Sequence, residues 1–204
     1  MTIRSIAPDS FASNCYLIVE DGHALVVDPA VSLAAILQAL GEESASCEGI
    51  VLTHGHFDHI LSMDELRKKE NVKVYIHQND AELLTDGRKN AFYEFFRRER
   101  VFGAADILLS DGDTIALGNE EIKVIHTPGH TEGSVCYLAG DFIITGDTLF
   151  AGTIGRCDLY GGDDTKIRES LTKLRSLPKD LTIYPGHGAS SPLGYALDTA
   201  AYYL

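Results

Sequence analysis

The sequence of 204 residues lacks several features that mark other classes of protein. It has no apolar run near the length that spans a bilayer, and it does not open with a basic segment followed by an apolar leader. It also has no Pro/Gly/Ser-rich linker and no low-complexity tract. With 45% hydrophobic residues, we expect one compact domain over residues 1–204, cytoplasmic and without a membrane partner.

Cysteine is sparse and scattered. Cys15, Cys47, Cys136 and Cys157 lie far apart, and none belongs to a Cys-x-x-Cys pair. We therefore expect reduced thiols rather than a disulfide framework.

Basic residues are the minority charge. The 17 Lys and Arg residues face 30 Asp and Glu residues, for a formal net charge of −13, and the one short basic block is Arg97-Arg98-Glu99-Arg100. Such a field repels polyanions, so the sequence favours a small-molecule substrate over nucleic acid.

Three imidazoles and a carboxylate are concentrated in the segment Thr53-His54-Gly55-His56-Phe57-Asp58-His59. The segment follows the predicted strand 49–52 and precedes a helical stripe that begins at residue 60. In extended backbone His54 and His56 project to the same side, while Asp58 and His59 enter the helix and diverge. One loop could thus serve two adjacent metal ions, whereas the alternative, a solvated polar turn, does not require this density of ligands.

The pattern His54-x-His56-x-Asp58-His59, with isolated His and Asp residues downstream, resembles the signature of the metallo-β-lactamase superfamily. The resemblance covers nearly the whole chain. It implies an α/β fold of the four-layer αβ/βα sandwich type.

Three further ligand candidates each follow a predicted strand. They are His130 in Thr127-Pro128-Gly129-His130-Thr131, Asp147 in Thr145-Gly146-Asp147-Thr148, and His187 in Tyr184-Pro185-Gly186-His187-Gly188. With the resemblance, the ligand set is His54, His56 and His130 for one metal, Asp58, His59 and His187 for the other, and Asp147 bridging both. Zinc is the first expectation for these two divalent ions, and iron or manganese suits the same ligand types.

Other residues near these motifs have weaker assignments. In the resembling family an Asp at the position of Asp28 supports the metal loop by hydrogen bonding, and a strand-terminating Asp is the alternative. His23, His77 and His126 are interpreted as strand or surface histidines, with a supporting role at the site as the alternative for His126. Cys157 is expected to be a bystander.

The resemblance also indicates a reaction. The segment from Gly146 to Asp158 looks like that of glyoxalase II-like (hydroxyacylglutathione hydrolase-like) enzymes and of related persulfide dioxygenases, with Arg156 at the position of a basic residue that grips the carboxylate of the thiol carrier. A salt bridge from Arg156 to Asp158 is the alternative. The chain ends seventeen residues after His187 and so resembles the short, single-domain members.

We therefore expect a thioester hydrolase, acting on a substrate such as S-lactoylglutathione by attack of metal-bridging hydroxide, with Asp58 and Asp147 in catalytic as well as ligand roles. The alternatives are an iron-dependent persulfide dioxygenase, a lactone or ester hydrolase of the same fold, and a metal-binding module without catalysis.

The remaining pattern predicts two groups of strands with covering helices. Strands are predicted at 2–6, 15–19, 24–27, 49–52, 72–76, 115–117, 122–125, 134–138, 142–145 and 181–184. Helices are predicted from Ser32 as N-cap to Gly41, over 79–84, and from Asp164 or Thr165 as N-cap to before Pro178. The aromatic segment 88–100 is predicted to be a helix on the domain edge, with a lid over the metal site or a surface for a second subunit as alternatives.

Overall fold

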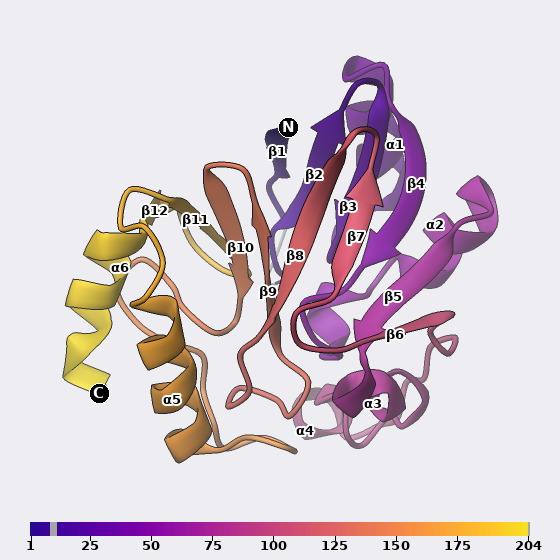
Figure 1. The fold of residues 1–204 in the computed structure, drawn as a ribbon. Helices are drawn as coiled ribbons and strands as arrows, with labels where there is room; N and C mark the ends of the chain where they lie inside the picture. The colour runs from indigo at the N-terminus through magenta and orange to yellow at the C-terminus, as the bar shows by residue number, and fades with distance from the viewer. Residues whose placement is uncertain (9–11, 204) are drawn as a thin grey trace.

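The computed structural model describes residues 1–8 and 12–203. Two mixed sheets of six strands form its centre (Figure 1). The first sheet, in the order β1-β2-β3-β4-β5-β6, consists of β1 (Thr2–Ile6), β2 (Cys15–Glu20), β3 (His23–Val27), β4 (Ser46–Val51), β5 (Lys73–His77) and β6 (Ile107–Leu109). The second, in the order β12-β11-β10-β9-β8-β7, consists of β7 (Thr114–Leu117), β8 (Glu120–His126), β9 (Val135–Ala139), β10 (Phe142–Gly146), β11 (Thr182–Pro185) and β12 (Ser191–Pro192).

Helices cover the outer face of each sheet. The longer helices are α1 (Leu33–Glu42), α2 (Met63–Glu70), α5 (Asp164–Leu174) and α6 (Leu193–Thr199), and the short ones are α3 (Ala81–Thr85) and α4 (Phe92–Phe96). Three 3-10 turns, η1 (Phe57–His59), η2 (Gln78–Asp80) and η3 (Ala200–Tyr203), complete the described elements. In Figure 1, α5 and α6 flank the second sheet on the left, and α1 and α2 lie beside the first sheet on the right.

Alternate residues of the strands build separate cores. On β2, Leu17 packs toward the helices with Ile36 of α1, while Ile18 packs between the two sheets. On β10, Ile143 packs against α5 and α6, while Ile144 packs between the sheets. Because successive strand residues face opposite sides, both sheets are buried on two faces, and the predicted four-layer αβ/βα sandwich is confirmed.

Several predicted boundaries were wrong for local reasons. Helix α1 continues through Gly41 and ends at Glu42, since the N–H of Glu43 still bonds back to the carbonyl of Ala39. Helix α5 is capped by Asp163, whose side chain accepts hydrogen bonds from the N–H groups of Thr165 and Lys166. Strands β6 and β12 were not predicted, because segments of three and two residues carry too short an alternation to recognise.

The predicted helix over 88–100 is also wrong, because only Phe92–Phe96 is helical. The residues at either end, Ala91 and Arg97, have left-handed backbone conformations with φ of 67° and 54°. A non-glycine residue in that region ends a right-handed helix, so the segment is one helical turn held between two bends.

Within the described ranges, no helix has the length and apolar character needed to cross a bilayer.

Candidate metal centre

The metal-ligand candidates meet where strands of both sheets end. His54 follows β4, His130 follows β8, Asp147 follows β10 and His187 follows β11. His54, His56, His59, His130 and Asp147 are buried, whereas Asp58 and His187 are partly exposed. Loops that are 133 positions apart along the chain, from His54 to His187, thereby contribute to one cluster.

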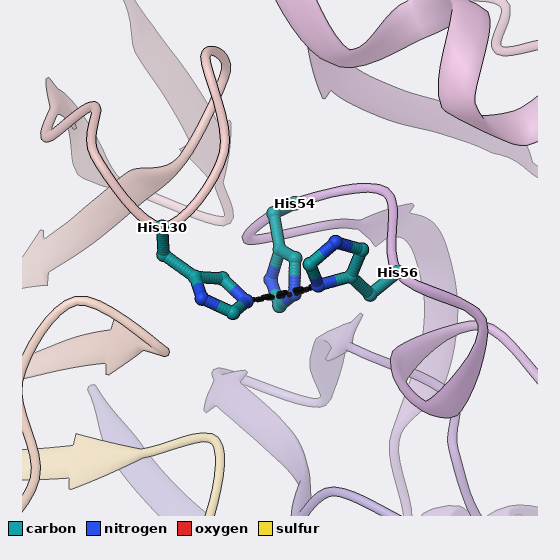
Figure 2. A group of neighbouring side chains, drawn as sticks. All are labelled: His54, His56 and His130. Carbon is teal, nitrogen blue, oxygen red and sulfur yellow. Dashed lines mark hydrogen bonds between the residues drawn. The ribbon is translucent and has the colours of Figure 1, made fainter. Parts of the chain in front are cut away.

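Three imidazoles converge on one point (Figure 2). His56 Nδ1 lies 3.1 Å from His54 Nε2 and 2.9 Å from His130 Nε2, and the two Nε2 atoms are 3.2 Å apart. Ligand nitrogens at about 2.0–2.1 Å from a tetrahedral zinc ion would be separated by about 3.3 Å. The triangle of nitrogens therefore has nearly the size that one metal ion requires.

A second group of ligand atoms adjoins the first. Asp58, His59 and His187 form it, and His187 Nε2 lies 3.3 Å from Asp58 Oδ2. Asp147 stands between the groups, since its Oδ2 atom is 3.6 Å from both His130 Nε2 and His187 Nε2. A third group, His54, His59 and Asp147, overlaps both, so the structure brings all seven ligand candidates into one continuous cluster.

Asp28 holds two parts of the metal loop. One carboxylate oxygen accepts a hydrogen bond from the N–H of Thr53 at 2.8 Å, and the other accepts from Thr53 Oγ1 at 2.6 Å and from His59 Nδ1 at 2.9 Å. A proton on Nδ1 leaves His59 Nε2 free to act as a ligand. These contacts give Asp28 the geometry of a residue that supports ligands rather than one that binds metal.

His130 and His54 are oriented in the same way. His130 Nδ1 donates to the carbonyl of Arg156 at 2.7 Å, which turns its Nε2 toward the cluster. His54 Nδ1 lies 3.1 Å from Thr53 Oγ1, whose own hydrogen is directed to Asp28. Partners on the far nitrogen fix both the tautomer and the ring plane.

The charge environment favours the ligand-competent forms of His54, His56 and Asp147. Burial, together with His130, lowers the pKa of His56 to about 3, and burial lowers the pKa of His54 well below its usual value. For Asp147 burial raises the pKa, but the neighbouring His59 and His130 outweigh it and hold that pKa well below its ordinary range. Neutral imidazoles and an ionised carboxylate are the forms that bind a metal cation.

His59 shows that the cluster stabilises positive charge. Burial lowers its pKa, yet the carboxylates of Asp147 and Asp28 more than offset this, so the pKa lies well above its usual value. A cation among these groups is therefore electrostatically favoured.

The buried polar atoms supply a test of whether metal fits. His59 Nε2 and Asp147 Oδ1 are buried, 3.3 Å apart, and have no hydrogen-bond partner among the described residues. Buried polar atoms are otherwise almost always paired, so atoms left unpaired while facing one another suit a shared cation. The His/Asp cluster fits a binuclear metal site of His and carboxylate ligands.

Asp80 is a buried residue of the site that the sequence did not reveal. Its Oδ2 atom accepts from the N–H of Gly55 at 3.0 Å and from Thr131 Oγ1 at 2.7 Å, and its Oδ1 atom accepts from the N–H of Gly133 at 2.6 Å. Gly55 lies between two ligand histidines and Thr131 follows His130. One carboxylate thus joins the two loops that supply the three-histidine group.

Hydrogen bonds join the loop that carries His187 to the start of β2. Tyr16 donates its hydroxyl to the carbonyl of Pro185 at 2.6 Å, and Asn14 Nδ2 donates to the carbonyl of Gly188 at 2.9 Å. Between these positions, a Cβ at Gly186 would collide with the carboxylate of Asp147. Only glycine therefore allows the loop to come this close to the centre.

Two residues near the cluster have contacts elsewhere. His126 stacks on His77 with ring centroids 4.0 Å apart, and its Nε2 atom meets the carbonyl of Glu132 rather than a ligand candidate. Cys157 Sγ points to the carbonyl of Gly155 and belongs to none of the ligand groups among the described residues.

A cavity of about 870 Å³ opens over the cluster. Five of the seven ligand candidates line it, namely His56, Asp58, His130, Asp147 and His187. The other lining residues include Phe57, Phe95, Phe96, Phe150, Leu159 and Arg156. The side chain of Arg156 makes a bidentate pair with Asp158, at 2.6 and 2.7 Å, which is the alternative considered from the sequence.

Comparison with known proteins finds a matching family and several relatives of this chain. The family model of the metallo-β-lactamase superfamily matches residues 8–187. "Probable metallo-hydrolase YqgX" of Bacillus subtilis (strain 168) is 36% identical over 191 residues, covering 92% of this chain and 90% of the relative. "Probable polyketide biosynthesis zinc-dependent hydrolase PksB" of the same organism is 32% identical over 186 residues, covering 90% of this chain and 76% of the relative.

Solved structures give the same result. The BLEG-1 B3 metallo-beta-lactamase superposes with a TM-score of 0.93 at 31% identity, covering 99% of both chains. TTHA1623 in a di-iron-bound form superposes with a TM-score of 0.85 at 28% identity, covering 99% of this chain and 100% of that one.

Proposed function

The chain belongs to the metallo-β-lactamase superfamily, and as a metal-dependent hydrolase of that superfamily we propose that it cleaves a small thioester at a binuclear site. The observation that carries the proposal is the cavity in which five ligand candidates form the floor and Arg156 stands at the wall. A substrate in this cavity can place its carbonyl carbon against the cluster while its remaining parts contact the walls.

The ligand candidates have separate roles in this proposal. His54, His56 and His130 would hold one cation, Asp58, His59 and His187 would hold the other, and Asp147 lies between the two groups. Divalent ions bound there would supply an acidified water as nucleophile and Lewis-acid polarisation of the carbonyl group. Among the leaving groups of the acyl substrates considered, a thiolate needs the least assistance. This favours a thioester as the substrate.

Arg156 is proposed to bind a carboxylate on the substrate. Its pair with Asp158 is solvent-exposed, with 52% and 68% of the two side chains accessible, and such pairs contribute about 0–1 kcal/mol. A substrate carboxylate can therefore replace Asp158 as the partner of the guanidinium. S-lactoylglutathione, which carries such groups on its thiol part, is one candidate of this glyoxalase II-like class.

Zinc is the proposed metal, because the relative PksB is named as zinc-dependent and the ligand types suit zinc. The di-iron form of TTHA1623 makes iron the first rival. Metal analysis of protein purified without added ions distinguishes them.

A β-lactam is the second candidate substrate. The similarity to BLEG-1 favours it, since that protein is named as a B3 metallo-beta-lactamase and superposes over 99% of both chains. The same ligand candidates in the cavity would then act on a strained cyclic amide instead of a thioester. Lactones and simple esters belong in the same comparison.

The test is turnover of thioester, β-lactam, lactone and ester substrates by metal-loaded protein. We expect thioester hydrolysis to dominate, and Asp147→Asn to lose at least about 100-fold in kcat/KM. Asp141→Asn, at an exposed position in the turn just before β10, is the matched control and should match wild type. Wild-type turnover by Asp147→Asn, or no thioester hydrolysis by protein that contains both metals, would refute the proposal.

An iron-dependent persulfide dioxygenase is separated from these hydrolases by oxygen uptake with a glutathione persulfide. That chemistry needs one metal with two His and one carboxylate. The second ligand group, with Asp58, His59 and His187 all facing one another, supports hydrolysis instead.

A further inference from the structure

Four phenylalanines line the cavity above the metal centre. We call Phe57, Phe95, Phe96 and Phe150 the aromatic wall, and all four line the cavity. Phe57 comes from the metal loop itself, Phe95 and Phe96 from α4, and Phe150 from the loop after Asp147. The wall therefore combines three segments that the fold brings to the site.

Contacts fix the wall to the metal loop. The ring of Phe57 lies 5.7 Å from that of Phe95 and 5.6 Å from that of Phe96. The N–H of Phe57 donates to the carbonyl of buried Asn90 at 3.0 Å, and Asn90 Oδ1 accepts from the N–H of Phe92 at 3.1 Å. The position of α4 is thus set by the loop that carries the ligands.

The wall leaves apolar surface in contact with water. Phe95 is 58% exposed and Phe96 is 41% exposed. Exposed aromatic surface that borders a cavity is a feature of ligand sites, because an apolar group that covers it removes that surface from water.

The cavity offers few groups for a highly polar ligand. Apart from the ligand candidates, Arg156 and Thr153 are the only polar side chains among the described residues that line it. A peptide-like thiol carrier such as glutathione, with an ammonium group, two carboxylates and two amides, would meet only these two polar side chains apart from the ligand candidates. Such a carrier can satisfy one carboxylate at Arg156 but little else within the cavity.

We propose that the substrate is a thioester whose acyl group is an apolar chain or aryl group of several carbons, and that this group lies against the aromatic wall. The inference rests on the proposed thioester hydrolysis and refines it by naming the acyl class. The thioester carbonyl faces the metal centre, and the acyl chain extends along Phe57, Phe95 and Phe96. A volume of about 870 Å³ is at the upper end for small-molecule pockets and has room for such a chain.

A chain-length series tests the proposal. Acetyl, butanoyl, hexanoyl and octanoyl thioesters of N-acetylcysteamine, a small neutral thiol, are compared with S-lactoylglutathione on the metal-loaded enzyme. We expect kcat/KM to rise about two- to fourfold per added methylene, as burial of that group against the wall implies. A flat series, or faster turnover of S-lactoylglutathione than of octanoyl thioester, would overturn the inference.

A pair of variants assigns the effect to the wall. In the double variant Phe95→Ala/Phe96→Ala, the ratio of kcat/KM for the octanoyl thioester to kcat/KM for the acetyl thioester should fall about tenfold or more. The change should lie in KM. Tyr195→Ala is the matched control, since Tyr195 is also 58% exposed but does not line the cavity. The control should keep the wild-type ratio, and a ratio that is equally high in the double variant would contradict the assignment.

Binding separates this inference from the proposed function. S-alkyl thioethers of N-acetylcysteamine cannot be hydrolysed, and their affinities can be measured by calorimetry on the metal-loaded protein. If no thioester is turned over, the proposed function fails. The apolar subsite is still supported if affinity rises from the methyl to the octyl thioether in wild type but not in the double variant. Affinity that is independent of alkyl length overturns the subsite itself.

Discussion

Replacing Asp80 by alanine tests how the two histidine loops of the metal centre are held in register. The carboxylate is fully buried and accepts from Gly55, Thr131 and Gly133. The substitution would leave the N–H groups of Gly55 and Gly133 without their acceptor, while the Thr131 hydroxyl keeps Ser134 Oγ as a partner at 2.7 Å.

The magnitude follows from these three contacts. Each buried donor that loses its partner costs about 1–3 kcal/mol, and the relief of carboxylate burial offsets part of the sum. We expect Asp80→Ala to lower the free energy of unfolding of the metal-free protein by about 3–5 kcal/mol. Asp80→Asn keeps the volume and one acceptor but aims an amide N–H at a donor, so its loss should be smaller.

Metal affinity distinguishes positioning from general stability. Because Asp80 sets the distance between His130 and the pair His54 and His56, we expect about 10- to 100-fold weaker binding of the first metal, measured by competition with a chromogenic chelator. Asp106→Ala is the matched control, since Asp106 also accepts a backbone hydrogen bond, from Val74 at 2.9 Å, but lies outside the site. It should cost stability and leave metal affinity unchanged.

The reasoning about Asp80 is refuted by a specific result. If Asp80→Ala and Asp80→Asn are destabilised like Asp106→Ala yet bind both metals with wild-type affinity, the carboxylate only stabilises the fold. Should the alanine variant fail to fold, the asparagine variant carries the test.

Three further perturbations have defined outcomes. Burial and His126 lower the pKa of His77 to about 4, against an ordinary value of 6.5, so its contribution to the free energy of unfolding is fully present above pH 6.5 and is lost as the pH falls toward 4. His77→Gln should remove about 3 kcal/mol of that pH dependence in urea titrations of metal-free protein, and identical slopes would contradict this. Arg156→Ala should raise KM for a carboxylate-bearing thioester about tenfold more than for a neutral one, and an equal change for both would exclude the proposed carboxylate contact. Asp28→Asn preserves shape and tolerates the left-handed φ of 48°, but it should weaken the metal held by His59 about 10- to 100-fold in metal titrations, and unchanged affinity would rule out the supporting role.

The sequence predicted the fold and located the ligand candidates because both have local signatures. Alternating and continuous apolar segments indicated the strands, and each ligand motif follows directly after one of them. His130, Asp147 and His187 could be placed at strand ends in this way, since β8, β10 and β11 end within four residues of them. Convergence at one edge then follows from the way two packed sheets present their loops.

The residues that support the ligands could not be predicted in the same way. Asp80 bonds to Gly55, Thr131 and Gly133, which lie 25, 51 and 53 residues away, so nothing in its own segment reveals its role. Asn90 likewise connects α4 to Phe57 through contacts that only the folded chain creates.

The aromatic segment shows the limit of periodicity. Its spacing predicted a longer helix, but two left-handed residues confine the helix to Phe92–Phe96, and the N–H of Phe57 bonds to the carbonyl of Asn90 just before it. The phenylalanines of this segment suggested packing in a core, but they have different environments. Phe92 is buried, while Phe95 and Phe96 face the cavity.

The central claim is that seven side chains hold two neighbouring metal ions, and anomalous X-ray diffraction from crystals of the metal-loaded protein tests it most directly. The account predicts two anomalous peaks about 3.5–4 Å apart, one beside His54, His56 and His130 and the other beside Asp58, His59 and His187, with Asp147 contacting both. A single peak, or two peaks that do not share Asp147, would contradict it.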